Sequence, residues 1–377
     1  MFCLNAKLFV LKEMNILELY SGIGGMHFAL RESRVKGNIC TAIDINTVAG
    51  EVYKYNFPDV PMWNRNIQSM NINDLRKLNI NCILMSPPCQ PFTRTGLLKD
   101  QEDERTASLF HILKLIPQLE TLQYVLLENV KGFENSNSRH EVVKCLKSSE
   151  FNYTELILSP CQFGIPNSRH RYYLVAKKKS LKFVLTSSVL LTSLPENIMK
   201  LIPKSTHYQL LDKDKLRNTN GGKKCFKIKH ILELNDDQPS YLIPQKILQK
   251  HINVLDIRNS EDDGSCCFTK AYRHYNEGTG SVYCPLPKDI YATKIEESKK
   301  VDKSSYECLK ILESLKLRYF TPTEISRLMC FPEDFTFPNN ITVKQRYRLL
   351  GNSINVYVVS VLIFLLNIDK ADKQCIN

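Results

Sequence analysis

The sequence predicts an α/β protein: a doubly wound, mostly parallel sheet with a smaller domain inserted before the chain returns to the sheet. Two observations support this prediction. Through the first half of the 377-residue chain, short apolar runs alternate with helical patterns, and this alternation is typical of consecutive βαβ units. After Lys177 the alternation gives way to a lysine-rich stretch, and helical periodicity returns only near Thr321.

The individual elements follow from the spacing of apolar residues. The predicted strands cover residues 15–20, 39–44, 81–86, 124–128, 153–158 and 172–176, and the predicted helices cover 26–32, 47–55, 108–119 and 141–148. Because a helix that follows each strand carries the chain back to the start of the next, most of these strands should be parallel.

Four parts of the chain are expected. They are an N-terminal extension (1–13), a catalytic and cofactor-binding domain (14–177), a small target-recognition domain (178–316) and C-terminal helices that return to the first domain (317–377). The lysines at 177–179 suggest a solvated turn at the first boundary. The apolar stretch 355–368 is shorter than the roughly 20 residues of a membrane-spanning helix. We therefore expect a buried core helix there and no membrane partner.

Composition narrows the class of protein. With 43% hydrophobic residues the chain can bury a core, which excludes a disordered tail protein. The formal net charge of +12 favours a polyanionic partner, although many soluble basic proteins bind none. The 13 cysteines contain no CxxC pair, so we expect neither a disulfide framework nor a metal site. Reduced thiols indicate the cytoplasm, with the nucleus as a second location.

A small-residue loop, SGIGG at 21–25, follows the first predicted strand. Such a turn lets the backbone approach a ligand closely, and Asp44, which ends the next strand, stands where an acid accepts hydrogen bonds from ribose hydroxyls. Nicotinamide or flavin binding, or tight packing alone, would use a similar loop, and Asp44 could simply cap the helix near Thr47. Together the loop and the acid favour a nucleoside cofactor.

Cys89 is the candidate nucleophile. It lies in SPPCQPF, directly after the strand ending at Ser86, so it should stand at the carboxyl end of a parallel strand on a loop stiffened by prolines. Most of the other cysteines are expected to be small buried side chains. Arg94 and Arg171 are candidates for the positive charge that stabilises a thiolate.

Glu128 ends the next strand and should face the same crevice as Cys89. An acid in this position could also be a helix cap or half of an ion pair. The Cys89 thiol and the Glu128 carboxyl group could act together on a cytosine ring. A thiolate attacking ring carbon 6 pushes electrons toward ring nitrogen 3, where an acid stabilises the developing charge, and carbon 5 becomes nucleophilic.

Arg169 and Arg171 alternate at the start of the strand in NSRHRYYLVA. They are expected to point to one face and to clamp a base edge or a phosphate. A pair of ordinary surface arginines would give the same pattern. If the target base is flipped out of the nucleic acid, two guanidinium groups on one face could hold it in place, and this favours the functional interpretation.

The order of these motifs resembles that of the cytosine-5 methyltransferases, from about Met14 to the end of the chain. LYSGIGG is similar to the cofactor loop of that family, SPPCQPF to its nucleophile motif, ENV to its glutamate motif and NSRHR to its arginine motif. Near the end, RYFTPTEISRLMCFP and QRYRLLGNSINV resemble its last two segments. The resemblance implies the fold of the S-adenosylmethionine-dependent methyltransferases and the transfer of a methyl group to carbon 5 of a cytosine.

The resemblance also implies roles for individual residues. The catalytic residues would be Cys89, Glu128, Arg169 and Arg171. Those that bind S-adenosyl-L-methionine, and its product S-adenosyl-L-homocysteine, would be Tyr20, Ser21, Gly22, Ile23, Gly24, Gly25, Asp44, Ile45, Asn66, Ile67, Pro88, Asn352 and Ser353. The chain departs from the family pattern at Asn167, where glutamine is usual, at Asp44, where glutamate is common, and at Asn66, where an aspartate often contacts the adenine.

Within the family, four segments resemble those of the branch that acts on aspartate tRNA. They are MSPPCQPFTR, ENVKGFE, and CCFTKAY followed by EGTGS. This implies an anticodon-loop cytosine of tRNA-Asp as the target, a monomeric enzyme, and DNA as a weak substrate at most. A DNA methyltransferase would share every catalytic group. The sequence is also compatible with a catalytically silent nucleic-acid-binding protein that keeps a relic cofactor pocket and, more distantly, with a Rossmann oxidoreductase. Phosphate contacts are expected from Lys223, Lys224, Lys227 and Lys229.

Overall fold

A computed structural model describes residues 13–88, 106–203, 225–234 and 238–369. By their contacts, the residues form two compact units. Unit 1 comprises residues 1–158, 170–203 and 356–377, and unit 2 comprises residues 159–169 and 204–355. Each unit is therefore built from segments that are far apart in the sequence.

Unit 1 contains a seven-stranded sheet of order β3-β2-β1-β4-β5-β7-β6. The strands are β1 (Met14–Leu19), β2 (Gly37–Ile43), β3 (Met62–Trp63), β4 (Cys82–Met85), β5 (Tyr124–Val130), β6 (Phe151–Leu158) and β7 (Arg171–Lys178). All neighbours pair in parallel except β7, which is antiparallel to both β5 and β6. The predicted doubly wound, mostly parallel sheet is confirmed.

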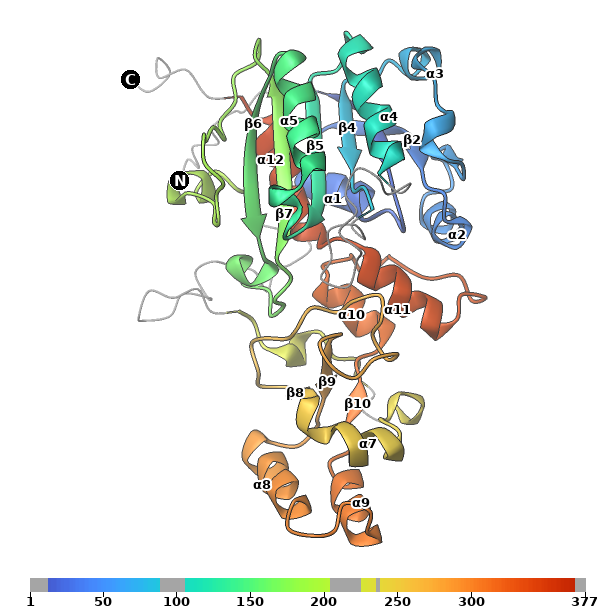
Figure 1. The fold of residues 1–377 in the computed structure, drawn as a ribbon, viewed down its shortest axis with the longest axis vertical. Coiled ribbons are helices and arrows are strands. Elements are labelled where there is room, and N and C mark those ends of the chain that lie inside the picture. Colours follow the sequence, from blue (N-terminus) through green and yellow to red (C-terminus); the bar gives the residue numbers. More distant parts are fainter. Residues whose placement is uncertain (1–12, 89–105, 204–224, 235–237, 370–377) are drawn as a thin grey trace, which may run out of the picture. The chain divides into compact units, whose positions relative to one another are not determined.

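Helices cover both faces of this sheet (Figure 1). Helices α4 (Ala107–Leu115) and α5 (Asn137–Ser148) lie on one face, and α1 (Gly25–Ser33) and α12 (Val356–Asn367) pack against each other on the opposite face. The remaining helices of the unit are α2 (Thr47–Asn56), α3 (Ile72–Lys77) and α6 (Glu196–Met199).

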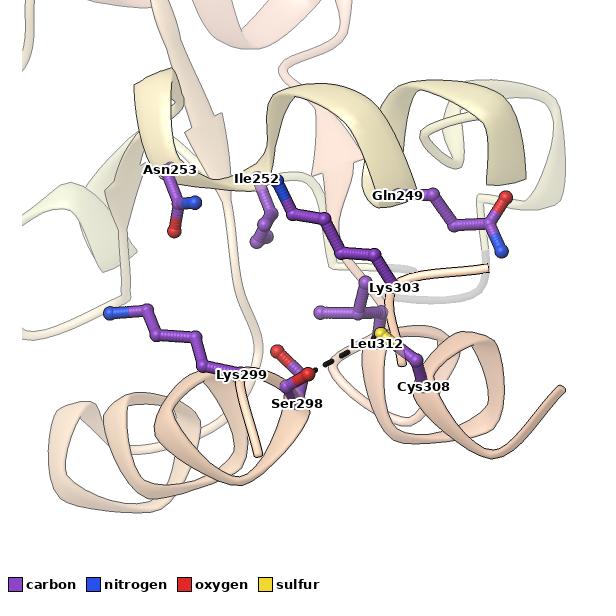
Figure 2. Close-up of a pocket in the computed structure, with 8 residues that line it drawn as sticks. All are labelled: Gln249, Ile252, Asn253, Ser298, Lys299, Lys303, Cys308 and Leu312. Carbon is purple, nitrogen blue, oxygen red and sulfur yellow. Dashed lines mark hydrogen bonds between the residues drawn. The ribbon is translucent and has the colours of Figure 1, made fainter. Parts of the chain in front are cut away.

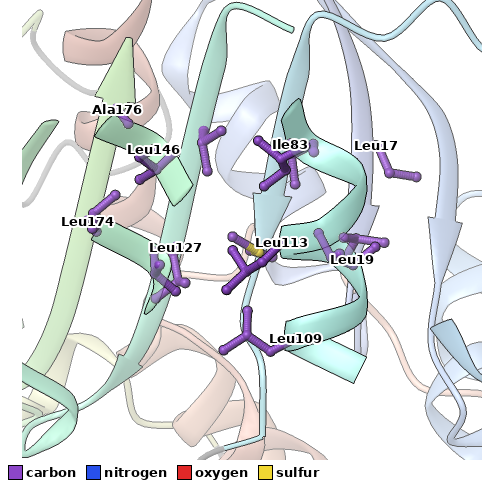
Figure 3. Packing of buried hydrophobic residues seen from close by; sticks show 14 of the residues in the cluster. Leu17, Leu19, Ile83, Leu109, Leu113, Leu127, Leu146, Leu174 and Ala176 are labelled. Carbon is purple, nitrogen blue, oxygen red and sulfur yellow. The ribbon is translucent and has the colours of Figure 1, made fainter. Parts of the chain in front are cut away.

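Alternate residues of the strands face the two layers, as the period of two requires. Leu17 and Leu19 of β1, Ile83 of β4 and Leu127 of β5 join the cluster under α4 and α5 (Figure 3). These side chains are 0% exposed, and burial of each contributes roughly 1.5–3 kcal/mol. Residues between them, such as Glu18, face the layer of α1 and α12.

Helix α12 is buried along its whole length. By length and composition, the 25-residue stretch Val343–Asn367, of which α12 is the last part, is apolar enough to cross a membrane, but 89% of its most apolar part is buried inside the structure. Its contacts with α1, β5 and β7 are those of a core helix, as the sequence predicts.

Unit 2 contains a small three-stranded sheet of order β10-β9-β8. Its strands are β8 (Asp256–Arg258), β9 (Ser281–Tyr283) and β10 (Arg318–Tyr319), and its helices are α7 (Gln245–His251), α8 (Lys288–Ser298), α9 (Tyr306–Glu313), α10 (Pro322–Leu328) and α11 (Val343–Asn352). A buried ion pair joins β10 to α10. The two terminal guanidinium nitrogens of Arg318 each donate a hydrogen bond of 2.8 Å to one carboxylate oxygen of Glu324.

The contact-based division of the chain differs from the predicted domain boundaries at both ends of the small domain. Strand β7 runs through Lys178, and Lys177 is 0% exposed, so the solvated turn begins only at Lys179, which is exposed. Residues up to 203 belong to unit 1. Helices α10 and α11 belong to unit 2, and only α12 returns to the large sheet. The reason is that the apolar sides of α10 and α11 pack in unit 2.

Candidate active site

The candidate site lies at one edge of the large sheet, where several strands end together. Leu19 of β1 pairs with Met85 of β4, and Met85 pairs with Leu127 of β5. The next residues along these three strands are Tyr20, Ser86 and Glu128, of which Glu128 still belongs to β5, because that strand runs to Val130. Parallel pairing therefore brings the glycine loop, the proline loop and the candidate acid together, as the sequence predicts from strand ends alone.

The glycine loop is held in a conformation that few sequences adopt. Tyr20, Gly22 and Gly24 have φ values of 56°, 54° and 84°, in the left-handed region that favours glycine. A Cβ atom at Gly24 would lie under 3.0 Å from the ring of Phe57, whereas no atom lies within 4 Å of a Cβ at Gly22. The loop therefore packs tightly on one side and leaves open space at Gly22. Ser21, Ile23 and Gly25 complete the turn into α1.

Asp44 fastens this loop to the end of β2. Its Oδ2 accepts a hydrogen bond of 2.8 Å from the backbone N–H of Gly22, and its Oδ1 accepts one of 2.8 Å from Asn46. The cap of α2 is Asn46, whose side chain accepts from Val48 and Ala49. The hypothesis that Asp44 caps this helix is thus wrong. Burial raises the pKa of Asp44, against hydrogen bonds to backbone N–H groups that lower it.

Ile45, next to Asp44, leaves 70% of its surface exposed. A large apolar side chain beside a carboxylate and an open glycine turn fits a nucleoside, because the ring needs apolar cover and the sugar needs acceptors. The structure thus brings Asp44, Ile45 and the glycine turn close together, and their role in binding a cofactor stays a prediction.

Asn66 and Ile67 match their expected role less well. Asn66 caps a short 3₁₀ helix, and its side chain bonds to both the backbone N–H and the side-chain oxygen of Gln68. Ile67 is 4% exposed. The Asn66 side chain is therefore engaged within its own segment, and the Ile67 side chain packs in the core cluster of the large sheet.

The proline loop is tied to its neighbours on both sides. Ser86 donates a hydrogen bond of 3.1 Å to the carbonyl of Tyr20, and the Asn129 amide donates one of 3.3 Å to the carbonyl of Pro87. These bonds tie Ser86 to the glycine loop and Pro87 to β5, and Pro88 follows next in the chain. Sequence reasoning missed the role of Asn129, although its place in ENV could have suggested it. The residue that follows, Cys89, and Arg94 lie outside the described residues.

Glu128 and Arg171 lie side by side. Antiparallel pairing of β5 with β7 sets Val130 opposite Arg171, and Arg171 Nε lies 3.5 Å from Glu128 Oε1. Their side chains are 10% and 16% exposed for Glu128 and Arg171 respectively. An acid and a planar cation thus stand together at the edge that carries Pro88.

Arg169 does not share this position. Strand β7 begins at Arg171, and Arg169 belongs to unit 2, where it is 3% exposed. Its guanidinium donates to the carbonyls of Phe268 (2.9 Å), Gly351 (3.0 Å) and Ser353. The expectation that Arg169 and Arg171 project from one strand face is therefore corrected. Arg169 instead joins two segments of unit 2, the one at Phe268 and the end of α11, through their carbonyl groups.

The C-terminal candidates, Asn352 and Ser353, lie at the end of α11 in unit 2. Asn352 is exposed, and the carbonyl of Ser353 is one of the groups that Arg169 binds. Asn167, one of the departures from the family pattern, is 2% exposed and donates to Ser265 Oγ (3.1 Å) and to the carbonyl of Cys266 (2.9 Å). Its amide thus supports the same part of unit 2.

A buried network under the glycine loop was not predicted. Tyr53 donates a hydrogen bond of 2.9 Å to Glu18 Oε2, and its hydroxyl lies 3.1 Å from His27 Nδ1. Burial raises the pKa of Glu18 to about 8 and lowers that of His27 to about 4. Both groups are therefore largely uncharged at neutral pH, which suits a position inside the core. The sequence gives no signal for this role of Glu18, because the residue lies within an apolar strand pattern.

Unit 2 holds a separate pocket of about 160 Å³ between α7, α8 and α9. Figure 2 shows Ile252, Cys308 and Leu312 among its lining residues, with the ammonium groups of Lys299 and Lys303 at its sides. Lys299 is paired with Glu296 at 2.6 Å. None of the predicted site residues lines this pocket.

Comparison with known proteins defines the class. The chain belongs to the family of C-5 cytosine-specific DNA methylases, which matches residues 14–364. It is thus a cytosine-5 methyltransferase by family, as its motifs predict.

Individual relatives are more specific. A Spodoptera frugiperda protein named tRNA (cytosine(38)-C(5))-methyltransferase is 43% identical over 354 residues, covering 93% of this chain and 98% of its own. A Dictyostelium discoideum protein named DNA (cytosine-5)-methyltransferase is 36% identical over 373 residues, covering 94% and 95%. The crystal structure of a mutant of Spodoptera frugiperda DNMT2 matches with a TM-score of 0.80 at 42% identity, covering 93% and 98%.

Proposed function

We propose that this protein transfers a methyl group from S-adenosyl-L-methionine to carbon 5 of a cytosine in tRNA, with an anticodon-loop cytosine of tRNA-Asp as the target. The observation that carries the proposal is the common sheet edge. There the Gly22–Asp44 turn, the proline loop and the Glu128–Arg171 pair stand together. The tRNA substrate is supported by the name of the Spodoptera frugiperda relative.

The residues at this edge fit the cofactor. The exposed Ile45 would cover an adenine, Asp44 would accept from ribose hydroxyls, and the open space at Gly22 would admit the amino-acid end of the molecule. Bound there, S-adenosyl-L-methionine supplies an electrophilic methyl group on a sulfonium.

The chain's own groups then activate the cytosine. The Cys89 thiolate attacks ring carbon 6, and Glu128, hydrogen-bonded to ring nitrogen 3, supplies a proton as charge develops there. The guanidinium of Arg171, beside Glu128, binds the ring carbonyl oxygen. Carbon 5 takes the methyl group, a base removes the proton from carbon 5, and elimination of the cysteine restores the ring.

The substrate is tested by methyl transfer from labelled cofactor to purified tRNA-Asp and to duplex DNA. We expect label in the tRNA at a single anticodon-loop cytosine, located by mapping methylated positions, and little in DNA. A matched tRNA-Asp with uracil at that position is the control. Equal or greater labelling of DNA would overturn the tRNA proposal and favour the activity in the name of the Dictyostelium discoideum relative.

The covalent step is tested at Cys89. Replacing Cys89→Ala should abolish transfer while leaving tRNA binding largely in place, because the thiol makes its bond only during reaction. tRNA carrying 5-fluorocytosine at the target should become trapped on the wild-type protein in the presence of cofactor, since fluorine cannot leave as a proton does. Denaturing electrophoresis detects the adduct. Turnover by the alanine variant would refute the mechanism.

A further inference from the structure

Unit 2 presents an exposed aromatic side chain among basic residues, outside the site described above. Tyr275 leaves 62% of its surface exposed. Its ring contacts that of His274 with centroids 4.6 Å apart at 64°. Lys270, Arg273 and His274 are exposed in the same segment, and the exposed acid there is Glu277. We call residues 270–275 the aromatic platform.

The aromatic platform is firmly held from below. The hydroxyl of Tyr272, which is 5% exposed, donates to the carbonyl of Ser281 (2.7 Å) and accepts from the N–H of Phe320 (2.9 Å). The ring of Tyr272 packs edge-on against those of Tyr319 and Tyr347. Tyr275 is thus exposed on an ordered support, and ordering it on binding costs little conformational entropy.

The backbone of the platform is closed by further hydrogen bonds. Thr279 Oγ1 donates to the carbonyl of Tyr275 (2.7 Å), and the N–H of Tyr275 donates to the carbonyl of Ala271 (3.1 Å). Arg273 takes a φ of 66°, and its guanidinium lies 5.6 Å from the centre of the Tyr319 ring. A non-glycine residue held at positive φ shows that the surrounding packing determines this conformation.

The platform is continuous with the segment that the motif arginine holds. Arg169 binds the carbonyl of Phe268, two residues before Lys270. On the other side, a Cβ atom at Gly351 of α11 would lie under 3.0 Å from the backbone of Thr269 and Lys270. The start of the platform is therefore fastened between Arg169 and the end of α11.

We propose that Tyr275 is a stacking surface for an unpaired base of the RNA substrate, with Lys270 and Arg273 close enough along the chain to bind its phosphates. A fixed aromatic face among cations is what single-stranded nucleic acid recognition uses, because every base has a face that stacks and every link carries a negative charge. The inference rests on the proposed function, since it names a contact to the same RNA. The pocket of Figure 2 is a weaker candidate, because its Lys299 is already paired with Glu296.

The test compares Tyr275→Ala with Tyr306→Ala. Tyr306, on α9 of the same unit, is 71% exposed and has Lys310 4.7 Å from its ring centre, so it is a matched exposed tyrosine beside a cation. For Tyr275→Ala we expect KM for tRNA-Asp to rise about tenfold or more, with affinity for S-adenosyl-L-homocysteine unchanged. Tyr275→Trp should restore KM, and Tyr306→Ala should behave as wild type.

Two outcomes would overturn the platform. One is a KM within twofold of wild type for Tyr275→Ala. The other is an equal loss in both alanine variants, which would indicate a general surface effect. Fluorescence quenching of 2-aminopurine placed in the anticodon loop reports stacking without methyl transfer. If quenching depends on Tyr275 but the wild-type protein transfers no methyl group to tRNA, the stacking role of Tyr275 is supported and the proposed function is contradicted. Transfer to tRNA without such quenching would do the reverse.

Discussion

A buried carboxyl group beneath the glycine loop shows how single residues set the conditions under which this protein is stable. Glu18 lies on the face of β1 that carries α1 and α12, with Tyr53 donating to one of its oxygens. Burial is the largest cause of its raised pKa, about 8 against an ordinary 4.5. In the unfolded chain the same carboxyl group ionises near the ordinary value.

This difference predicts a pH-dependent stability. Because the pKa in the folded state is the higher one, the protonated form favours folding below pH 4.5, and this contribution is lost as pH rises toward 8 at about 1.4 kcal/mol per pH unit. Replacing Glu18→Gln removes the titration while keeping an acceptor for Tyr53. We expect the free energy of unfolding of this variant to exceed that of wild type increasingly from pH 5 to pH 8, measured by urea titration.

Glu120→Gln, at an exposed carboxyl of unit 1, is the control for this comparison. It should follow the wild-type curve over the same range. Parallel curves for wild type and Glu18→Gln would show that Glu18 is not the group that titrates.

At the scale of elements, the close packing of helix α11 on the backbone where the aromatic platform begins leads to a second prediction. In an isolated helix, Gly→Ala stabilises by about 1 kcal/mol. At Gly351 the new Cβ would instead press on the backbone of Thr269 and Lys270. Backbone atoms cannot turn aside as a side chain does, so Gly351→Ala should destabilise the protein by about 1–3 kcal/mol.

Gly264→Ala is the matched control, because no atom lies within 4 Å of a Cβ there. Its thermal midpoint should stay close to wild type, while that of Gly351→Ala falls. A midpoint for Gly351→Ala at or above wild type would mean that α11 can move away from the segment without loss.

Secondary structure in the first half of the chain could be predicted because apolar periodicity there reflects burial on both sheet faces. The strands at 15–20, 124–128 and 153–158 were predicted close to β1, β5 and β6. Unit 2 was not predicted in detail. Its strands are two or three residues long, which is too short for a period of two to be recognised.

At the scale of the whole molecule, unit 1 depends on residues from both ends of the chain. Lys177 of β7 is 0% exposed, and its ammonium donates to the carbonyls of Asn367 (3.4 Å) and Ile368 (3.0 Å) and lies 2.8 Å from Asp369 Oδ1. One buried cation therefore holds the end of α12 against the sheet.

Removing the charge of Lys177 should weaken the attachment of the end of α12 to the sheet. Lys177→Met keeps most of the side-chain volume but leaves the buried carbonyls without their donor, so we expect a loss of about 2 kcal/mol in the free energy of unfolding. Lys179→Met removes an exposed lysine paired with Glu150 and should have no measurable effect. Hydrogen exchange at α12 should rise only in the Lys177 variant, and equal exchange in both would contradict this role.

The sequence by itself determined the family, the two strands near whose ends Asp44 and Glu128 lie, and the order in which the motifs meet one edge of the sheet. It could do so because these depend on local periodicity and on the rule that parallel strands end together. Only the tertiary structure decided that Arg169 binds carbonyl groups of unit 2 while Arg171 lies beside Glu128, that Lys177 is buried, and that Glu18 is a core residue. Those outcomes depend on which distant segment packs over each side chain, and no pattern of neighbouring residues records that.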